Sequence, residues 1–499
     1  MSGNPATLIP VALFLILGVG ITFFVRYQSR KRRESGFVSE YFIGSRSLGA
    51  FVLAMTTIAT YGSVSSFVGG PGQAWNVGFG WVYMATIQVT ALFLLYGIMG
   101  KKMALISRKL GAVTVIDVIR ARYNSNALAN ISALVIVLFF GATMVAQFVG
   151  GAKLFEAVTG YSYLVGLAIF GVAAILFTSV GGFRGVAFVD TLCGIAMIVG
   201  IVVLAGGILD AGGGYTNIMA NLHPNNPELL DPLGGGAMPI GLYFTQWLLV
   251  GVFTFCLPQS VVRCMGYKDS KSLRQAMIIG TIIIGAMMIG VTTLGVLAKG
   301  ILPADISVYG NSVDNIIPLA IVQSLPPWLA GVAIIGPVAA SISTVASLLI
   351  FSSSSIIKDM YLHYREEKNS VPTQKHIARC SQVFTFVVGV IVFVLSIVPP
   401  DVIWRINMFA FGGLETAFCW VLVMGLFWKR ANKTGALLSM VGGTLAYCVT
   451  MGLGITFFGL HQIVIGISVS LLCMVVGSLV SKPKDALQEQ KVRAVFFGE

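Results

Sequence analysis

Charged residues are scarce in this sequence. They make up 10% of it, whereas hydrophobic residues make up 56%, and the mean hydropathy is +0.89. Soluble domains carry roughly 25% charged residues. The composition therefore excludes a water-soluble protein and indicates a chain embedded in a membrane.

Residue types suited to catalysis or metal binding are also few. The four histidines are dispersed and there is no nucleophile-elbow motif, which argues against a membrane enzyme. No pair among the seven cysteines has metal-ligand spacing, so we expect them to be packing residues. The loops carry no nucleotide-binding motif, so any uphill transport would have to use an ion gradient.

Apolar tracts, by contrast, are abundant, and each has about the 20 residues that a helix needs to cross a bilayer. The thirteen tracts are Leu8–Val25, Leu48–Phe67, Gly78–Met99, Leu128–Gly151, Tyr161–Val180, Val186–Leu209, Ala237–Val262, Ala276–Ala298, Trp328–Ile357, Val383–Val398, Val402–Phe427, Ala436–Phe457 and Gln462–Val480. Strands of an outer-membrane barrel would be about 10 residues long with alternating polarity. We therefore expect an all-α integral membrane protein.

Basic residues indicate the orientation of these tracts. No Lys or Arg precedes the first tract and a basic cluster at residues 30–33 follows it, so it is not a cleaved signal peptide and the N-terminus is expected outside. Thirteen crossings then place the C-terminus in the cytoplasm. On this map 29 of the 32 Lys and Arg residues lie inside, the exceptions being Lys153, Lys299 and Arg405. The net charge of +13 is thus an orientation signal facing anionic lipid in the plasma membrane, not a nucleic-acid surface.

Two tracts, the second and the seventh, have the composition of broken helices. The second is dense in hydroxyls, with Gly62 in mid-span, and the seventh contains Gly251 and Pro258. Unwound backbone at the middle of a membrane exposes carbonyls that bind cations. Each broken tract begins a block of five tracts, and an odd number of spans inverts the second block relative to the first.

This pattern predicts the organisation of the whole chain. We expect a first helix and basic loop at 1–47, a five-helix repeat at 48–209, an outer loop at 210–236, a second five-helix repeat at 237–428, two further helices at 429–481, and a cytoplasmic tail at 482–499.

Three charged residues lie inside the tracts, where charges are costly. Asp190 is near the inner end of its span, so it is either wetted by the cytoplasm or functional. Arg405 lies one turn from Asp401 near an outer mouth, where a solvated ion pair is expected. Glu415 lies in mid-span after two glycines and has either a functional or a structural role.

Four stretches of the sequence together resemble the sodium/solute symporter family. They are residues 40–46, Gly69–Gly72, Gly181–Arg184 with Asp190, and Ser343–Thr344, and the resemblance extends over all thirteen tracts. It implies a LeuT-like core of two inverted five-helix repeats, with sodium as the coupling ion and no other cofactor.

The resemblance also implies a sodium site between the second and ninth tracts. Its ligands would be the carbonyls of Ala59, Gly62 and Ala340 and the hydroxyls of Ser343 and Thr344. Such oxygen ligands suit a hard cation. Asp190 matches an acid of the family on the sodium exit path.

The substrate would lie beside this sodium site. Within the family, residues 59–72, 262–271 and 411–415 most resemble members that carry pantothenate, and the alternatives are proline, a sugar, sialic acid or another vitamin. A transporter-like sensor or a channel is a further alternative. The candidate substrate residues, chosen by position, are Thr60, Tyr61, Ser63, Gln88, Gln147, Tyr243, Gln246, Trp247 and Glu415. Because Arg405 is the only basic residue within a tract, we expect a carboxylate to meet half-helix N–H groups and hydroxyls instead.

Overall fold

The computed structural model describes residues 5–31, 46–303, 312–370, 372–398, 403–481 and 486–498. Within these ranges the regular structure is helical, apart from two isolated β-bridges. Most of the 40–46 stretch, the basic residues at 32 and 33, and Asp401 lie outside the described residues.

Ten helical stretches are long and apolar enough to cross a membrane, and two bent pairs of helices bring the number to twelve in the described residues. The long helices are α1 (Pro5–Lys31), α9 (Asn126–Thr159), α10 (Tyr163–Ala211), α15 (Ser270–Ala298), α17 (Pro327–Ser354), α19 (Gln374–Leu395), α20 (Ile403–Phe427), α21 (Lys433–Gly452) and α22 (Ile463–Val480). The tenth stretch consists of α5 (Phe79–Ala85), η3 (Thr86–Val89), α6 (Thr90–Leu94), η4 (Leu95–Gly100) and α7 (Lys101–Leu110). The expected all-α membrane fold is confirmed.

The helix α10 contains both the fifth and the sixth tract. A straight helix of this length would extend about 70 Å, more than twice the hydrocarbon core of a bilayer. The backbone at Gly182 is not helical, with φ 58° and ψ −172°. On either side of it, Thr178 and Asp190 contact the consecutive residues Ala346 and Ser347 of α17. The chain therefore reverses direction at Gly182, and α10 accounts for two of the thirteen tracts.

The two bent pairs lie where the sequence predicts broken helices. In the second tract, α3 (Ala50–Tyr61) meets the helix at residues 65–77, formed by η2 (Ser65–Gly69) and α4 (Gly70–Val77), at 65°. In the seventh, residues 240–256 and 258–266 meet at 43°. The second bend occurs where Pro258, which has no N–H to continue the ladder, begins a new helix.

The seventh tract and the connections are built from shorter helices. The seventh contains α12 (Ile240–Trp247), η7 (Leu248–Val252), η8 (Phe253–Cys256), α13 (Pro258–Val261) and α14 (Arg263–Gly266). The others are α8 (Val115–Tyr123), α11 (Tyr215–Asn225), η5 (Pro227–Leu230), η6 (Gly234–Gly236), η10 (Val313–Asn315), α16 (Ile316–Ser324), η11 (Ser355–Leu362), α18 (His363–Glu367) and α23 (Ala486–Phe496).

Polar residues cap helices in the loops. Thr114 accepts a hydrogen bond from the N–H of Asp117 at 3.0 Å in a capping box at the start of α8. Asp269 accepts one from the N–H of Ser272 at 2.8 Å at the start of α15. That hydrogen bond holds the pKa of Asp269 below its usual range.

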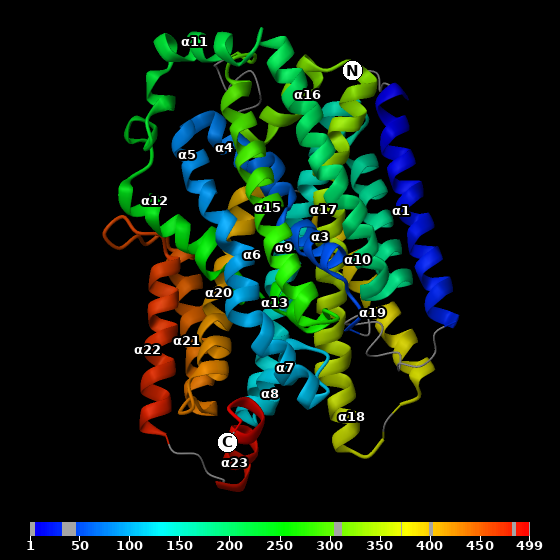
Figure 1. Ribbon diagram of the computed structural model, residues 1–499, viewed down its shortest axis with the longest axis vertical. Coiled ribbons are helices and arrows are strands. Elements are labelled where there is room, and N and C mark those ends of the chain that lie inside the picture. The colour runs from blue at the N-terminus through cyan, green and yellow to red at the C-terminus, as the bar shows by residue number, and fades with distance from the viewer. Residues whose placement is uncertain are drawn as a thin grey trace.

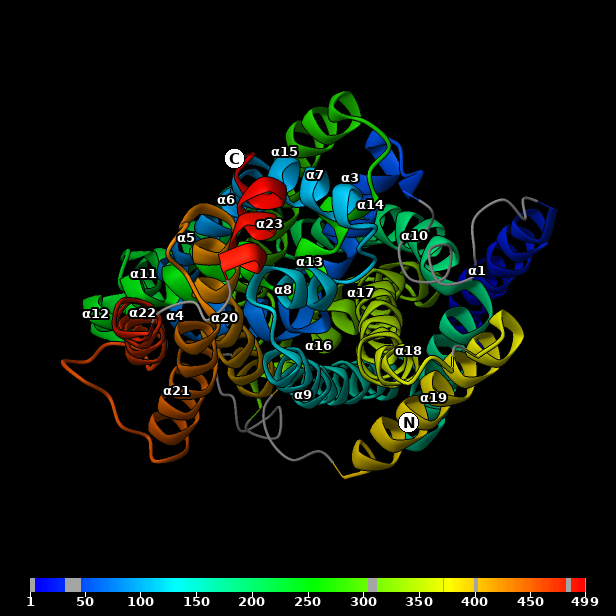
Figure 2. The same ribbon diagram turned by 90° about the horizontal axis from the view of Figure 1, so that it is seen from below.

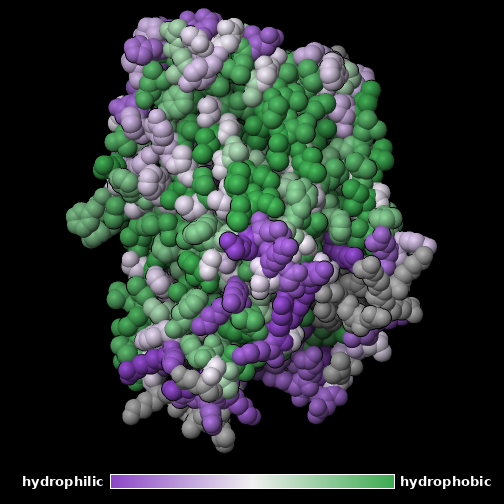
Figure 3. All heavy atoms as spheres, in the orientation of Figure 1, coloured by the Kyte–Doolittle hydropathy of each residue, from purple (hydrophilic) through white to green (hydrophobic). Residues whose placement is uncertain are grey.

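The helices form one bundle with α17 buried near its centre (Figures 1 and 2). α1 and α19 lie on one side of the bundle and α21 and α22 on the opposite side, while α23 lies at the end that carries the C-terminus. Hydrophobic residues cover most of the height in Figure 3, and hydrophilic residues gather at the upper rim and toward the lower end. This distribution suits a protein surrounded by lipid along its middle.

Candidate functional site

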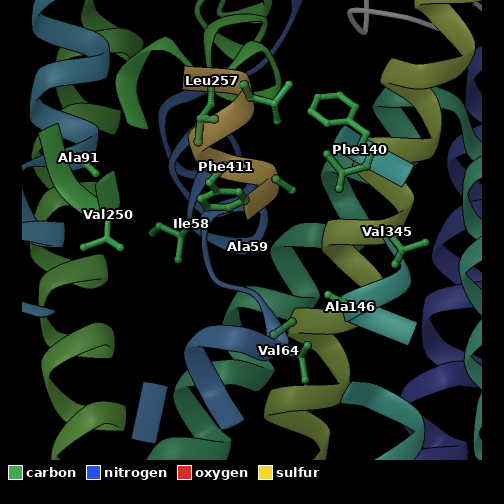
Figure 4. Close-up of a cluster of buried hydrophobic side chains, with 14 of the residues drawn as sticks. Ile58, Ala59, Val64, Ala91, Phe140, Ala146, Val250, Leu257, Val345 and Phe411 are labelled. Carbon is green, nitrogen blue, oxygen red and sulfur yellow. The ribbon is translucent and has the colours of Figure 1, made fainter. Parts of the chain in front are cut away.

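The break in the second tract exposes backbone oxygen atoms in the core of the bundle. Gly62 has an extended conformation, with φ −68° and ψ 120°, so the helix cannot continue through it. The N–H of Val64, beyond the break, donates to Oε1 of Gln147 on α9 at 2.8 Å instead of to a carbonyl of α3. Figure 4 shows the apolar side chains around the break, including Ala59, Val64, Ala146 of α9 and Val345 of α17. The unwound carbonyls thus lie among closely packed, buried side chains.

Two hydroxyls of α17 point at these carbonyls. Ser343 Oγ donates to the carbonyl of Ala59 at 2.9 Å and reaches that of Ala340 at 3.2 Å. Thr344 Oγ1 lies 2.8 Å from the carbonyl of Ala340 and 3.3 Å from that of Gly62. All five residues are buried. The structure therefore places each of the two hydroxyls within hydrogen-bond distance of two of the three carbonyls expected to bind sodium.

These five groups suit a monovalent hard cation. Carbonyls and hydroxyls are neutral oxygen ligands, and none of them titrates near neutral pH. The carbonyl of Ala59 also lies at the C-terminal end of α3, the negative end of the helix dipole. A cation at this point would replace hydrogen bonds between hydroxyls and carbonyls with direct contacts to their oxygen atoms.

Next to this cluster lies a buried ion pair between Asp190 and Arg263. Nη2 of Arg263 is 3.5 Å from Oδ2 of Asp190, and both side chains are almost fully buried, at 1% and 0% exposure. Thr56 Oγ1 donates to the same carboxylate oxygen at 2.7 Å. Ser347 links the pair to α17, the helix of the ninth tract, because its hydroxyl accepts a hydrogen bond from Arg263 at 3.0 Å.

Arg263 also joins the pair to the sodium candidates. It donates to Thr60, the residue that follows Ala59. Its guanidinium lies over the ring of Phe351, 5.6 Å from the centroid. Four separate elements, α3, α10, α14 and α17, therefore meet around one guanidinium group.

The geometry corrects two expectations about charge. Arg405 is not the only basic residue in the membrane core, because Arg263, counted above as a cytoplasmic loop charge, is fully buried in the bundle. Asp190 is not wetted by the cytoplasm, because it is buried against Arg263. A signal for Arg263 was present in the sequence, since apolar residues continue for three positions beyond it, from Cys264 to Gly266.

Four of the substrate candidates surround the break itself. Thr60 belongs to the Arg263 network, and Ser63 is buried next to Gly62. The hydroxyl of Tyr61 donates to the carbonyl of Val250 in η7, which ties the two broken tracts together. Gln147 accepts a hydrogen bond from the N–H of Val64, beyond the break. Its Nε2 atom is buried and has no hydrogen-bond partner in the described structure.

The remaining candidates lie farther along the chain. Tyr243 and Trp247 pack their rings 5.4 Å apart on α12, and Gln246 lies four residues before Val250. Gln88 is half-buried in η3, which contacts η7. In the described structure, buried polar atoms without a partner include Gln246 Oε1, Trp247 Nε1 and both carboxylate oxygens of Glu415. Buried groups of this kind are costly unless something else satisfies them.

Comparison with known proteins identifies the family. The model of the sodium:solute symporter family matches residues 41–443. The chain belongs to this family.

Two relatives and one solved structure describe its place in the sodium:solute symporter family. The sodium/pantothenate symporter of Escherichia coli is 41% identical over 94% of this chain and 96% of its own length. The sodium/pantothenate symporter of Haemophilus influenzae is 38% identical over 99% of this chain and 100% of its own length. A sodium-coupled sialic acid symporter in a substrate-bound, outward-open state matches with a TM-score of 0.81 at 18% identity, over 96% of this chain and 98% of the other. The chain thus has the LeuT-like fold, and its relatives are named as sodium-coupled transporters, not enzymes.

Proposed function

We propose that this protein is a sodium-coupled symporter that carries pantothenate into the cytoplasm. The observation that carries the proposal is 41% and 38% identity, over nearly the full length, to two proteins named as sodium/pantothenate symporters. Alternative substrates of the family, such as proline, a sugar, sialic acid or another vitamin, lack a comparable argument from this chain.

Sodium would bind at the break in the second tract. The ligands are the carbonyls of Ala59, Gly62 and Ala340 and the hydroxyls of Ser343 and Thr344, which already lie close together. Pantothenate is an anion, and moving one negative charge against the potential of a negative cell interior costs about 2.3 kcal/mol per 100 mV. One sodium ion per anion cancels this cost. Asp190, beside the site, would lie on the path by which sodium leaves.

Pantothenate would bind between the two broken tracts. It offers two hydroxyls and an amide N–H as donors, together with carboxylate and amide oxygens as acceptors. Buried atoms without a partner match these groups of pantothenate. Gln246 and Glu415 offer oxygen acceptors for its donors, and Gln147 and Trp247 offer N–H donors for its oxygens. Arg263 is already engaged with four side chains, so it serves the structure of the site and not the carboxylate.

The orientation and the partition of the chain belong to the same proposal. The N-terminus is placed outside and the C-terminus in the cytoplasm, on the distribution of basic residues. The repeats span 48–209 and 237–428, and the bends in the first tract of each repeat support this division.

Uptake into proteoliposomes tests the substrate. With an inward sodium gradient, we expect saturable accumulation of labelled pantothenate that unlabelled pantothenate blocks and proline does not. Replacement of external sodium by potassium or choline is the control. Uptake equally fast in all three salts would contradict the proposal, and accumulation of another solute instead would keep the transporter but change its substrate.

Arg405→Gln tests whether the exposed arginine binds the carboxylate. Arg405 lies exposed near the start of α20, away from the buried ion pair, so we expect the substrate concentration for half-maximal uptake to stay within a few-fold of wild type. A charge-assisted bidentate contact, if lost, would raise it by about a hundredfold or more. The measurement is sodium-driven uptake at varied pantothenate concentration.

A further inference from the structure

A basic cavity lies at the end of the bundle that carries the C-terminus, far from the candidate site. It has a volume of about 660 Å³, within the range of small-ligand pockets. It is formed by the end of α8, the loop between α20 and α21, the end of α22 and the helix α23. Among the described residues, five basic side chains and one acidic side chain line it: Arg122, Lys429, Arg430, Lys433, Arg493 and Glu489.

Arg122 and Arg493 are held by contacts within the protein. Arg122 donates to the carbonyls of Gly425 and Trp428 at 2.7 and 3.0 Å, so it caps the C-terminal end of α20. Arg493 pairs with Glu489 at 2.6 Å. The lining therefore keeps an excess of positive charge, to which the exposed side chains of Arg430 and Lys433 contribute.

The start of α21 adds to this positive potential. Lys433 is the first residue of α21, whose N-cap Asn432 accepts from the N–H of Gly435 at 3.1 Å. The amide of Asn432 donates to the carbonyls of Ser478 and Ser481 at 3.1 Å each. These bonds hold the end of α22 against the start of α21, so the wall of the cavity is rigid. The positive end of the α21 dipole favours an anion there.

An apolar groove continues from this cavity along the outer face of α21 and α22. It has a volume of about 400 Å³ and shares Thr434 and Ser481 with the basic cavity. Its other residues include Leu438, Leu472 and Val476, which are 50%, 63% and 55% exposed. A soluble phosphate would leave this groove without a role. A molecule with an anionic head and a long apolar chain matches both hollows at once.

We propose that these two hollows bind one anionic phospholipid. The phosphate of the headgroup lies in the basic cavity near Arg430 and Lys433, and an acyl chain lies in the groove between α21 and α22. This inference uses the proposed orientation, in which this end of the bundle faces the cytoplasmic leaflet. Anionic lipids give that leaflet a negative surface potential. Charge complementarity and the continuity of the two hollows are its grounds.

Native mass spectrometry of the full-length protein in detergent tests the site. The probes are phosphatidylglycerol, phosphatidylcholine with matched acyl chains, and inorganic phosphate. The double variant Arg430→Gln, Lys433→Gln should retain phosphatidylglycerol about tenfold more weakly than wild type. The matched control Lys375→Gln, Arg379→Gln removes the same charge from exposed positions on α19 and should behave as wild type.

A second variant tests the groove independently of charge. Val476→Trp fills the groove at an exposed position, so it should fold normally and weaken retention of phosphatidylglycerol while leaving the basic cavity intact. Equal retention of the two lipids by wild type, an equal loss in the control pair, or retention unaffected by Val476→Trp would overturn the proposal. Displacement of phosphatidylglycerol by millimolar inorganic phosphate would show a site for soluble anions and would also overturn it.

Discussion

Replacement of Arg263 by glutamine should abolish sodium-driven uptake and destabilise the protein. The change leaves the carboxylate of Asp190 buried without its counter-charge, and breaking a buried pair in this way costs about 3–5 kcal/mol. It also removes the hydrogen bonds that Arg263 donates to Thr60 of α3 and Ser347 of α17. Both helices carry residues of the candidate sodium site. The measurements are the apparent melting temperature in detergent and uptake into proteoliposomes.

Two further variants separate charge from geometry. Arg263→Gln combined with Asp190→Asn should recover much of the lost stability, because no unpaired charge remains, but not uptake. Arg263→Lys keeps the charge and loses the planar fork, so it should be intermediate in stability. Arg379→Gln, which removes an exposed arginine from α19, is the control and should resemble wild type. Wild-type stability and uptake in Arg263→Gln would show that the ion pair does not organise the site.

Ser343→Ala and Thr344→Ala should each raise the sodium concentration for half-maximal uptake at least tenfold, with normal expression. Each change removes one of two side-chain oxygens, and a lost ligand to a desolvated cation costs more than about 1.4 kcal/mol, which corresponds to tenfold. Substrate affinity at low sodium should fall in parallel, because coupling between two ligands is reciprocal.

Conservative changes distinguish a ligand from a packing residue. Thr344→Ser keeps the oxygen and should be mild. Ser353→Ala removes a buried hydroxyl on the same helix, one that donates to Ser381 of α19 at 3.2 Å, and should leave sodium dependence unchanged. If Thr344→Ala kept wild-type sodium dependence and Thr344→Ser did not, the methyl group would matter and the sodium site would lie elsewhere.

Features encoded by local composition could be predicted from the sequence. The bends in the second and seventh tracts follow from glycine, proline and hydroxyl residues within otherwise apolar runs. The reversal at Gly182 follows from the short glycine-rich interruption, with one arginine, that separates the fifth and sixth tracts. The pairing of Ser343 and Thr344 with unwound carbonyls needed the family resemblance, because hydroxyls in membrane helices commonly bond to their own backbone.

Features that depend on long-range packing could not be predicted in this way. The positive-inside rule places Arg263 in a loop, because the rule counts charges near span ends and takes no account of burial. Its partners Thr56 and Ser347 come from segments distant in the chain, and only tertiary packing brings them to one guanidinium. The unsatisfied oxygens of Glu415 are likewise visible only once the neighbouring helices are in place.

The broken second helix has a consequence for how variation at the site should be interpreted. Three of the five candidate ligands are main-chain oxygens, of Ala59, Gly62 and Ala340, and every amino acid carries that atom. Homologues can therefore differ in side chain at these positions and still present the same oxygen, provided that the new side chain fits. At Gly62 the limit is volume, since an added Cβ would lie 3.2 Å from the carbonyl of Ile58 and 3.5 Å from the sulfur of Met197. Variation at Gly62 should therefore be limited to small residues, whereas at Ser343 and Thr344 the identity of the side chain itself would indicate the sodium site.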